Sequence, residues 1–139
     1  MRHNRPSRWL IDIAPLMIWM GFIFLLSSRS RLVQFDEPLL ATLFFKSAHV
    51  GVYAVLLWLW WRAISPQREI KPKVLGLALF LTVLYGISDE IHQSYVPGRT
   101  AHLADVCFDT AGALIMIIAI RWLKQNQVAD KIGSRFYSA

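Results

Sequence analysis

The sequence predicts an all-α integral membrane protein, a bundle of four transmembrane helices with both termini in the cytoplasm. Hydrophobic residues make up 55% of the 139 residues and charged residues 17%, whereas soluble proteins have about 25% charged residues. The apolar residues form runs separated by short polar segments. The basic residues, which give a net charge of +6, lie at the ends of these runs and not along one face. This placement excludes a nucleic-acid partner and leaves a soluble bundle of buried helices as the alternative fold.

Four apolar runs are candidate spans; they cover residues 9–26, 43–61, 74–87 and 103–120. The third has 14 residues, which rise about 21 Å as a helix, short of the ~30 Å hydrocarbon core. Its helix can cross only by continuing through residues 88–93, which brings carboxyl groups below the membrane surface. Before the second run, Asp36-Glu37-Pro38 resembles a helix start with Asp36 as the N-cap, so Lys46 should lie deeper than the hydropathy boundary suggests.

Basic residues predict the orientation. Eleven of the 15 Lys and Arg residues lie before the first run, between the second and third, or after the fourth. Cytoplasmic loops are enriched in these residues, so both termini should face the cytoplasm, and the chain should lie in the cytoplasmic (inner) membrane. Residues 1–124 then form the transmembrane domain and residues 125–139 a short cytoplasmic tail. Asp12 follows Arg8 by four residues, and we expect the two to pair at the interface.

Polar side chains concentrate in the halves of three spans that this orientation places toward the outside. Within each span they recur at helical spacing, so they share one face. Such groups are costly in hydrocarbon and usually face the bundle interior or a water-filled cavity. The sequence therefore predicts one shared polar pocket near the outer surface. Its members are Lys46, His49 and Tyr53 on the second span, Asp89, Glu90 and Gln93 on the third, and Asp105 and Asp109 on the fourth.

The charges of this predicted pocket do not balance. Four carboxyl groups face two fixed cations, Lys46 and Arg99. A low-dielectric site resists an excess of negative charge, so it should retain protons, charge its histidines or bind a cation. Hard oxygen ligands favour a divalent cation such as Mg²⁺, Ca²⁺ or Mn²⁺, although neutral histidine could bring in Zn²⁺. No spacing in the chain is a metal-binding signature, so the sequence assigns no specific metal ligands.

The connection between the third and fourth spans contains Pro97-Gly98-Arg99. Proline and glycine at these positions predict a type II turn. We expect the turn to hold Arg99 over the carboxyl groups of the flanking helices. Two interpretations are open: an Arg–Asp clamp that fastens the hairpin, or a guanidinium that recognises a phosphate or carboxylate on an envelope lipid or peptide.

These residues resemble the signature of the VanZ-like family of small bacterial membrane proteins. The resemblance covers roughly residues 10 to 123 and rests on Lys46-x-x-His49-x-x-x-Tyr53, Ser88-Asp89-Glu90-x-x-Gln93, Pro97-Gly98-Arg99 and Asp105-x-x-x-Asp109-x-x-Gly112. Family members commonly have Asp where this chain has Phe45 and Asn where it has Asp109. The family is named for a protein linked to glycopeptide (teicoplanin) resistance. The resemblance therefore implies a place of action at the cell envelope, but no resistance activity for this chain.

The leading functional hypothesis is an outer-leaflet pocket that binds a membrane lipid, a lipid-linked ligand or a cell-wall precursor, with modification of that ligand left open. A proton- or cation-coupled transporter component and a non-catalytic assembly partner held by a structural ion-pair network are the alternatives. The sequence does not indicate whether the protein is a monomer or an oligomer. In the leading hypothesis the candidate catalytic residues are His49, Asp89, Glu90 and Asp105, and the candidate ligand-binding residues are Lys46, Tyr53, Gln93, Arg99 and Asp109.

Overall fold

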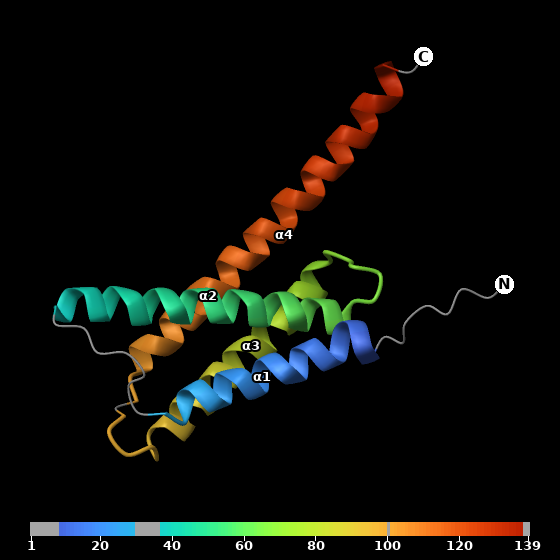
Figure 1. Ribbon diagram of the computed structural model, residues 1–139. Helices are drawn as coiled ribbons and strands as arrows, with labels where there is room; N and C mark the ends of the chain where they lie inside the picture. The colour runs from blue at the N-terminus through green and yellow to red at the C-terminus, as the bar shows by residue number, and fades with distance from the viewer. Residues whose placement is uncertain (1–8, 30–36, 100, 138–139) are drawn as a thin grey trace.

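The computed structural model describes the backbone over residues 9–29, 37–99 and 101–137 and the side chains over 10–29, 37–99 and 101–127. Among these residues, a π-helical turn at Trp9–Ile13 leads into α1 (Ala14–Ser27), followed by α2 (Pro38–Ile64), α3 (Pro72–Gln93) and α4 (Leu103–Tyr137) (Figure 1). The described part of the chain contains no strand and has 4 helical segments long and apolar enough to cross a membrane. The predicted all-α class with four candidate spans is confirmed.

The helix boundaries explain how the short third run crosses. The α3 helix has 22 residues, about 33 Å of rise, and it continues through residues 88–93 as predicted. The α2 helix begins at Pro38, with Glu37 in extended backbone at the cap position; Asp36, the predicted N-cap, lies outside the described residues. The α4 helix runs without a break through residues 125–137, so most of the segment predicted as a tail is helical. Its cytoplasmic location stays a prediction.

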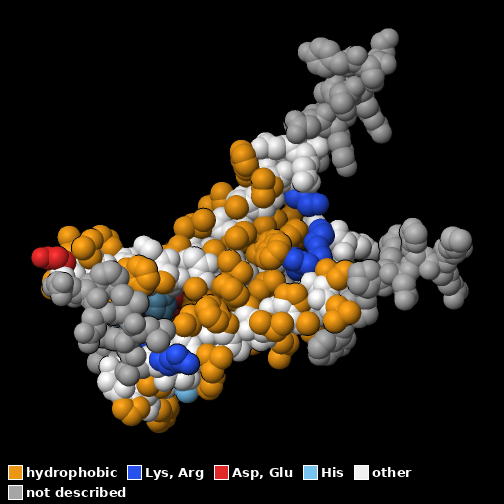
Figure 2. Space-filling model, in the orientation of Figure 1, with side chains coloured by type: hydrophobic (Ala, Val, Ile, Leu, Met, Phe, Trp, Pro, Cys, Tyr) orange, Lys and Arg blue, Asp and Glu red, His pale blue; other side chains and the backbone are white. Residues whose placement is uncertain are grey.

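The four helices alternate in direction, which gives the bundle two distinct ends. The start of α1, the described end of α4 and the connection between α2 and α3 lie at one end, called here the terminal end (Figure 1). The C-terminus of α1, the start of α2 and the connection between α3 and α4 lie at the other, called here the pocket end (Figure 1). Most of the Lys and Arg side chains visible in Figure 2 lie at the terminal end, and others lie at the pocket end. This matches the basic segments that predict a cytoplasmic location, and the side of the membrane stays a prediction.

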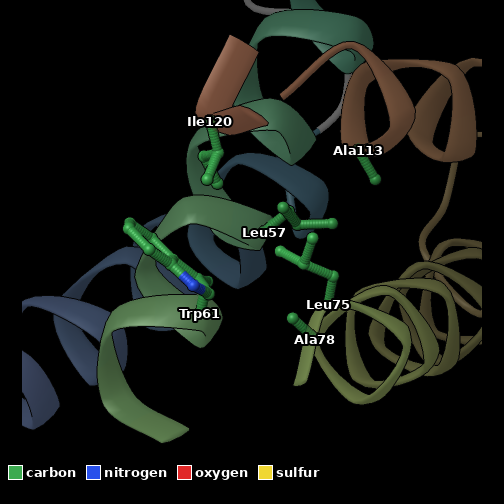
Figure 3. Packing of buried hydrophobic residues seen from close by; sticks show 6 residues of the cluster. All are labelled: Leu57, Trp61, Leu75, Ala78, Ala113 and Ile120. Atoms are coloured by element: carbon green, nitrogen blue, oxygen red, sulfur yellow. The ribbon is translucent and has the colours of Figure 1, made fainter. Parts of the chain in front are cut away.

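The helices bury little of their apolar surface against one another. Buried side chains from α2, α3 and α4 form a tight core toward the terminal end, made of Leu57, Trp61, Leu75, Ala78, Ala113 and Ile120 (Figure 3). Large apolar side chains elsewhere point outward, including Phe80 at 62% and Ile118 at 67% exposure, and apolar side chains dominate the visible surface (Figure 2). An outward apolar face is expected where lipid, not water, is the surrounding solvent.

A glycine sets the closest approach between two helices. The α2 helix packs against the other three helices, and its contact with α4 is the most extensive. Gly112 on α4 lies directly against the backbone of Val50 on α2, and a Cβ at this position would overlap the Val50 carbonyl. Small residues allow such approaches between membrane helices. This contact places the polar side chains of α2 and α4 within hydrogen-bonding reach of one another.

The terminal end is fastened by a buried carboxylate. Asp12 Oδ1 accepts hydrogen bonds from Nη2 of Arg62 at 3.1 Å and from Nη2 of Arg68 at 2.6 Å. Arg68 adopts a positive φ of 55° and also donates from Nη1 to the carbonyls of Arg62 and Ser65. The sequence predicted a local pair between Asp12 and Arg8, but Arg8 lies outside the described residues. The partners seen here come from α2 and the connection that follows it.

Candidate functional site

All nine predicted site residues lie at the pocket end of the bundle, and they are called here the polar cluster. The α2 helix supplies three of them, α3 three and α4 two, and the ninth, Arg99, is the last residue of the turn after α3. Because each helix presents its members on one face, the stripes predicted from helical spacing meet between the helices. The polar cluster comprises Lys46, His49, Tyr53, Asp89, Glu90, Gln93, Arg99, Asp105 and Asp109.

One histidine–aspartate contact and one ion pair connect α2 with α4. His49 Nδ1 lies 2.8 Å from Asp109 Oδ1, and Lys46 Nζ lies 3.8 Å from Asp105 Oδ1. The Lys46 ammonium also sits over the ring of Phe108, 4.1 Å from its centroid. Asp109 is 1% exposed, and its Oδ2 has no hydrogen-bond partner among the described residues. Asp105 and Asp109, four residues apart on α4, therefore lie opposite Lys46 and His49, three residues apart on α2.

The carboxylate of Asp89 is held from within α3 and from α2. Its Oδ2 accepts hydrogen bonds from Gln93 Nε2 at 2.9 Å and from the Tyr53 hydroxyl at 3.4 Å. All three side chains are buried. Within the described part of the chain, no hydrogen bond reaches Asp89 Oδ1. The two hydrogen bonds thus fix the orientation of the carboxylate, and both use Oδ2.

Sequence reasoning missed Gly86, which lets α3 come close to this network. A Cβ at Gly86 would lie 3.1 Å from Asp109 Oδ2 and 3.3 Å from Tyr53 Cε1. The missing side chain therefore makes room for the buried carboxylate of α4. Its position three residues before Asp89, on the polar face of the helix, was a signal that could have been used.

Glu90 fastens the hairpin between α3 and α4. Its Oε2 accepts a hydrogen bond from the backbone N–H of His102 at 2.9 Å, immediately before α4 begins. A carboxylate favours such a place because the N-terminus of a helix offers unpaired N–H groups and a positive dipole end. Oε1 of Glu90 is buried without a hydrogen-bond partner among the described residues. Glu90, predicted as a candidate catalytic residue, thus makes a structural contact in this structure.

The predicted type II turn is present. The N–H of Arg99 donates to the carbonyl of Val96 at 3.1 Å, and Gly98 has a φ of 79°, as the third position of this turn requires. The guanidinium donates from Nε to the Arg29 carbonyl and from Nη2 to the Leu26 carbonyl, both at 3.1 Å. Among the described residues Arg99 forms no ion pair, so the Arg–Asp clamp is not seen there. Its positive charge is held by neutral acceptors at the C-terminus of α1.

A second contact that the sequence did not reveal joins α1 to α3. Ser28 Oγ lies 3.0 Å from His92 Nε2, and the ring of Phe24 stacks on the imidazole with 4.4 Å between centroids. These residues lie on different helices, and no spacing within either helix indicates their proximity. Together with Arg99 they fix the C-terminus of α1 against the end of α3.

A cavity of about 270 Å³ opens between α1, α2, α3 and the turn that carries Arg99. Five members of the polar cluster line it, while the other four lie outside its lining. His49 connects the two sets of residues, because it lines the cavity and also contacts Asp109, which lies outside the lining. The polar lining consists of Ser27, His49, Tyr53, Asp89, Gln93 and Arg99, and the apolar lining of Ile23, Leu26, Phe44, Phe45, Ala48 and Val52.

Negative groups outnumber fixed positive ones in the polar cluster. The polar cluster contains four carboxyl groups and two fixed cations, Lys46 and Arg99. Asp109 and Glu90 each retain a buried oxygen with no hydrogen-bond partner among the described residues. Over the same residues, no group of three or more His, Cys, Asp or Glu side chains is arranged to hold a metal ion. A divalent cation at this site stays a prediction of the sequence.

Comparison with known proteins places the chain in a family. The family model VanZ/LLP1 matches residues 13–124. This range contains the whole polar cluster and all but the outermost residues of the four candidate spans. The chain belongs to the VanZ/LLP1 family. Membership confirms the predicted VanZ-like resemblance and agrees with an integral membrane protein. Neither a curated protein nor a solved structure matches the chain, so the geometry described above carries the functional argument for this VanZ-family protein.

Proposed function

We propose that this VanZ-family protein acts at the cell envelope by binding an amphiphilic lipid or lipid-linked cell-wall precursor in the cavity between α1, α2 and α3. One observation carries the proposal: the cavity joins an apolar wall to a guanidinium, Arg99, which forms no ion pair among the described residues. Ligand sites are typically apolar pockets with a few placed polar groups. An acyl or prenyl chain packs on the apolar wall, and an anionic head group binds Arg99.

The position of the cavity supports this ligand class. It lies at the pocket end, which the distribution of Lys and Arg predicts to face outside. In this orientation the cavity opens in the outer leaflet of the cytoplasmic membrane, where lipid-linked precursors are exposed to the envelope. Phe44 and Phe45, which line the cavity, lie near the start of α2. A ligand would thus keep its chain in the bilayer and its head group in the cavity.

The pair of His49 and Asp109 gives the site a route to modify its ligand. A carboxylate on Nδ1 fixes the imidazole tautomer and leaves Nε2 as a proton acceptor. His49 also lines the cavity, so this base faces the proposed ligand. Lys46 and Asp105 pair with each other outside the cavity lining. Their charges act on the electrostatic potential at the pair of His49 and Asp109.

A transporter is less well supported by the packing. The apolar core residues of α2, α3 and α4 (Figure 3) lie, along each of these helices, on the terminal-end side of the members of the polar cluster. Continuous polar groups or water are needed to carry a proton or cation through hydrocarbon. Measurable proton or cation flux in liposomes that contain the purified protein would overturn this ranking.

The proposal is tested in a deletion strain that carries variants of the protein. We expect deletion to change the profile of envelope lipids and peptidoglycan precursors, and the wild-type chain to restore it. Arg99→Gln and Asp105→Asn should fail to restore the profile at normal membrane abundance. Glu69→Gln is the matched control, since Glu69 pairs with Lys71 at the terminal end. Loss of abundance in the first two variants would instead support the non-catalytic assembly partner.

A further inference from the structure

We propose that the ligand of the cavity is a zwitterionic phospholipid whose head group carries both a phosphate and a primary ammonium group. This inference rests on the proposed function and specifies its ligand. Two cavity-lining charges of opposite sign carry it: Arg99, from the turn after α3, and Asp89, from α3 itself. A head group with only a negative charge would bind Arg99 but would place that charge near the carboxylate of Asp89.

Each of these two groups has capacity left for a ligand. Arg99 donates from Nε and Nη2 to the carbonyls of Arg29 and Leu26, and its Nη1 makes no hydrogen bond to any residue that the structure describes. Asp89 accepts both of its hydrogen bonds at Oδ2, and Oδ1 receives none from the described residues. Nη1 can thus donate to a phosphate oxygen, and Oδ1 can accept from an ammonium.

The neighbours of Asp89 fit this assignment. The Tyr53 hydroxyl and the Gln93 amide both donate to the carboxylate and fix its position. Neither neutralises its charge. In contrast, Asp105 already faces Lys46 and Asp109 already faces His49. Of the four carboxyl groups in the polar cluster, Asp89 is the one that both lines the cavity and lacks a cationic partner among the described residues.

The charge balance of the whole polar cluster points the same way. Its carboxyl groups exceed its fixed cations by two when all are ionised and histidine is neutral, and a low-dielectric site disfavours such an excess. A phosphate alone would offset the charge of Arg99 and increase the excess. A head group with a phosphate and an ammonium adds no net charge, and its ammonium faces the acidic side of the cavity.

The shape of the cavity is consistent with a small head group. Its volume of about 270 Å³ lies just below the ~300–1,000 Å³ of typical ligand pockets, which suits a phosphate with a short amine arm. The wall formed by Ile23, Leu26 and Phe44 then contacts the first part of an acyl chain. A larger sugar–peptide head group would have to extend out of the cavity.

The experiment is native mass spectrometry of the purified full-length protein with an equimolar mixture of phosphatidylethanolamine and phosphatidylglycerol of equal chain length. We expect wild-type protein to bind phosphatidylethanolamine in about tenfold excess, the effect of one charge-assisted hydrogen bond. Asp89→Asn should bring that ratio close to one without loss of phosphatidylglycerol binding. Arg99→Gln should weaken binding of both lipids. Glu69→Gln, the same acid-to-amide change at the terminal end, should leave the ratio unchanged.

A measurement on the wild-type protein alone guards against variants that fail to fold. Phosphatidylcholine has a quaternary ammonium with no N–H donor, so it should bind about tenfold more weakly than phosphatidylethanolamine. Free phosphoethanolamine should compete with the lipid only weakly, because it lacks the chain that packs on the apolar wall. Strong competition by the free compound would assign the site to a soluble ligand and overturn the phospholipid assignment.

The remaining outcomes separate this inference from the proposed function. A wild-type ratio near one, or a ratio that Asp89→Asn does not change, overturns the zwitterionic ligand. If binding still requires Arg99 in that case, the proposed function stands with an anionic amphiphile. If no lipid binds in a manner that depends on Arg99, both proposals are overturned.

Discussion

The two ends of the bundle differ in how completely their buried carboxyl groups are paired. At the terminal end, Asp12 is 5% exposed and receives hydrogen bonds from two arginines. At the pocket end, Asp109 is 1% exposed, contacts one histidine and has an oxygen without a hydrogen-bond partner among the described residues. Buried charges that serve only stability are usually paired with opposite charges, since an unpaired one is costly. The incomplete pairing at the pocket end supports the proposal that a ligand or a proton completes the network there.

The largest expected effect concerns the helix contact that assembles the pocket end. Gly112→Ala should destabilise the protein by about 3 kcal/mol or more, because the new methyl group overlaps the backbone of Val50 and the helices must separate. Gly76→Ala at the other end of the bundle is the matched control, since no atom lies within 4 Å of the added Cβ. Thermal unfolding in detergent compares the two. Equal melting temperatures would mean that α2 and α4 are not in close contact at Gly112.

Removal of the charge of Asp12 should have the next largest effect. Asp12→Asn leaves Arg62 and Arg68 without their carboxylate and should cost about 1.5–3 kcal/mol, the range for hydrogen bonds to charged groups. Glu69→Gln removes the partly exposed carboxylate that pairs with Lys71 and should cost about 0–1 kcal/mol. Unfolding curves of both variants measure the difference. A loss for Asp12→Asn no greater than that of the control would show that the terminal end is not held by this pair.

The same change at the pocket end should cost less. Asp109→Asn keeps an oxygen that can accept from His49 and removes a charge that is only partly paired, so these effects oppose each other. We expect the free energy of unfolding to change by less than about 1 kcal/mol. The VanZ-like resemblance agrees, because family members commonly have Asn at this position. If Asp109→Asn destabilises the protein as much as Asp12→Asn does, the contrast between the two ends is wrong.

These two ends also show how far the sequence can be interpreted. Polar residues at helical spacing predicted which faces meet at the pocket end, because the face of a helix depends only on its own spacing. The partner of Asp12 was not predictable in this way. Arg62 and Arg68 lie 50 and 56 residues further along the chain, and their approach depends on how α1 packs against α2. The extension of α3 followed from the thickness of the bilayer, which is a constraint independent of packing.

The pairing within the polar cluster was also beyond sequence reasoning. Charge alone would allow Lys46 to face Asp105, Asp109 or Asp89. The close contact at Gly112 sets the rotation of α4 against α2, and that rotation pairs Lys46 with Asp105. A cavity lined by only part of the polar cluster likewise depends on where α1 lies. One sequence specifies the faces of helices but not their crossing angles.

The last prediction concerns which end faces the outside and changes labelling without changing stability. In a Cys107→Ser background, which removes the single cysteine of the chain, Ala101→Cys places a thiol at the exposed pocket end and Gln67→Cys places one at the exposed terminal end. A membrane-impermeant maleimide should label the first variant in intact cells, and the second only after the membrane is opened. The reverse pattern would place the cavity on the cytoplasmic side, and the ligand would then have to come from the inner leaflet.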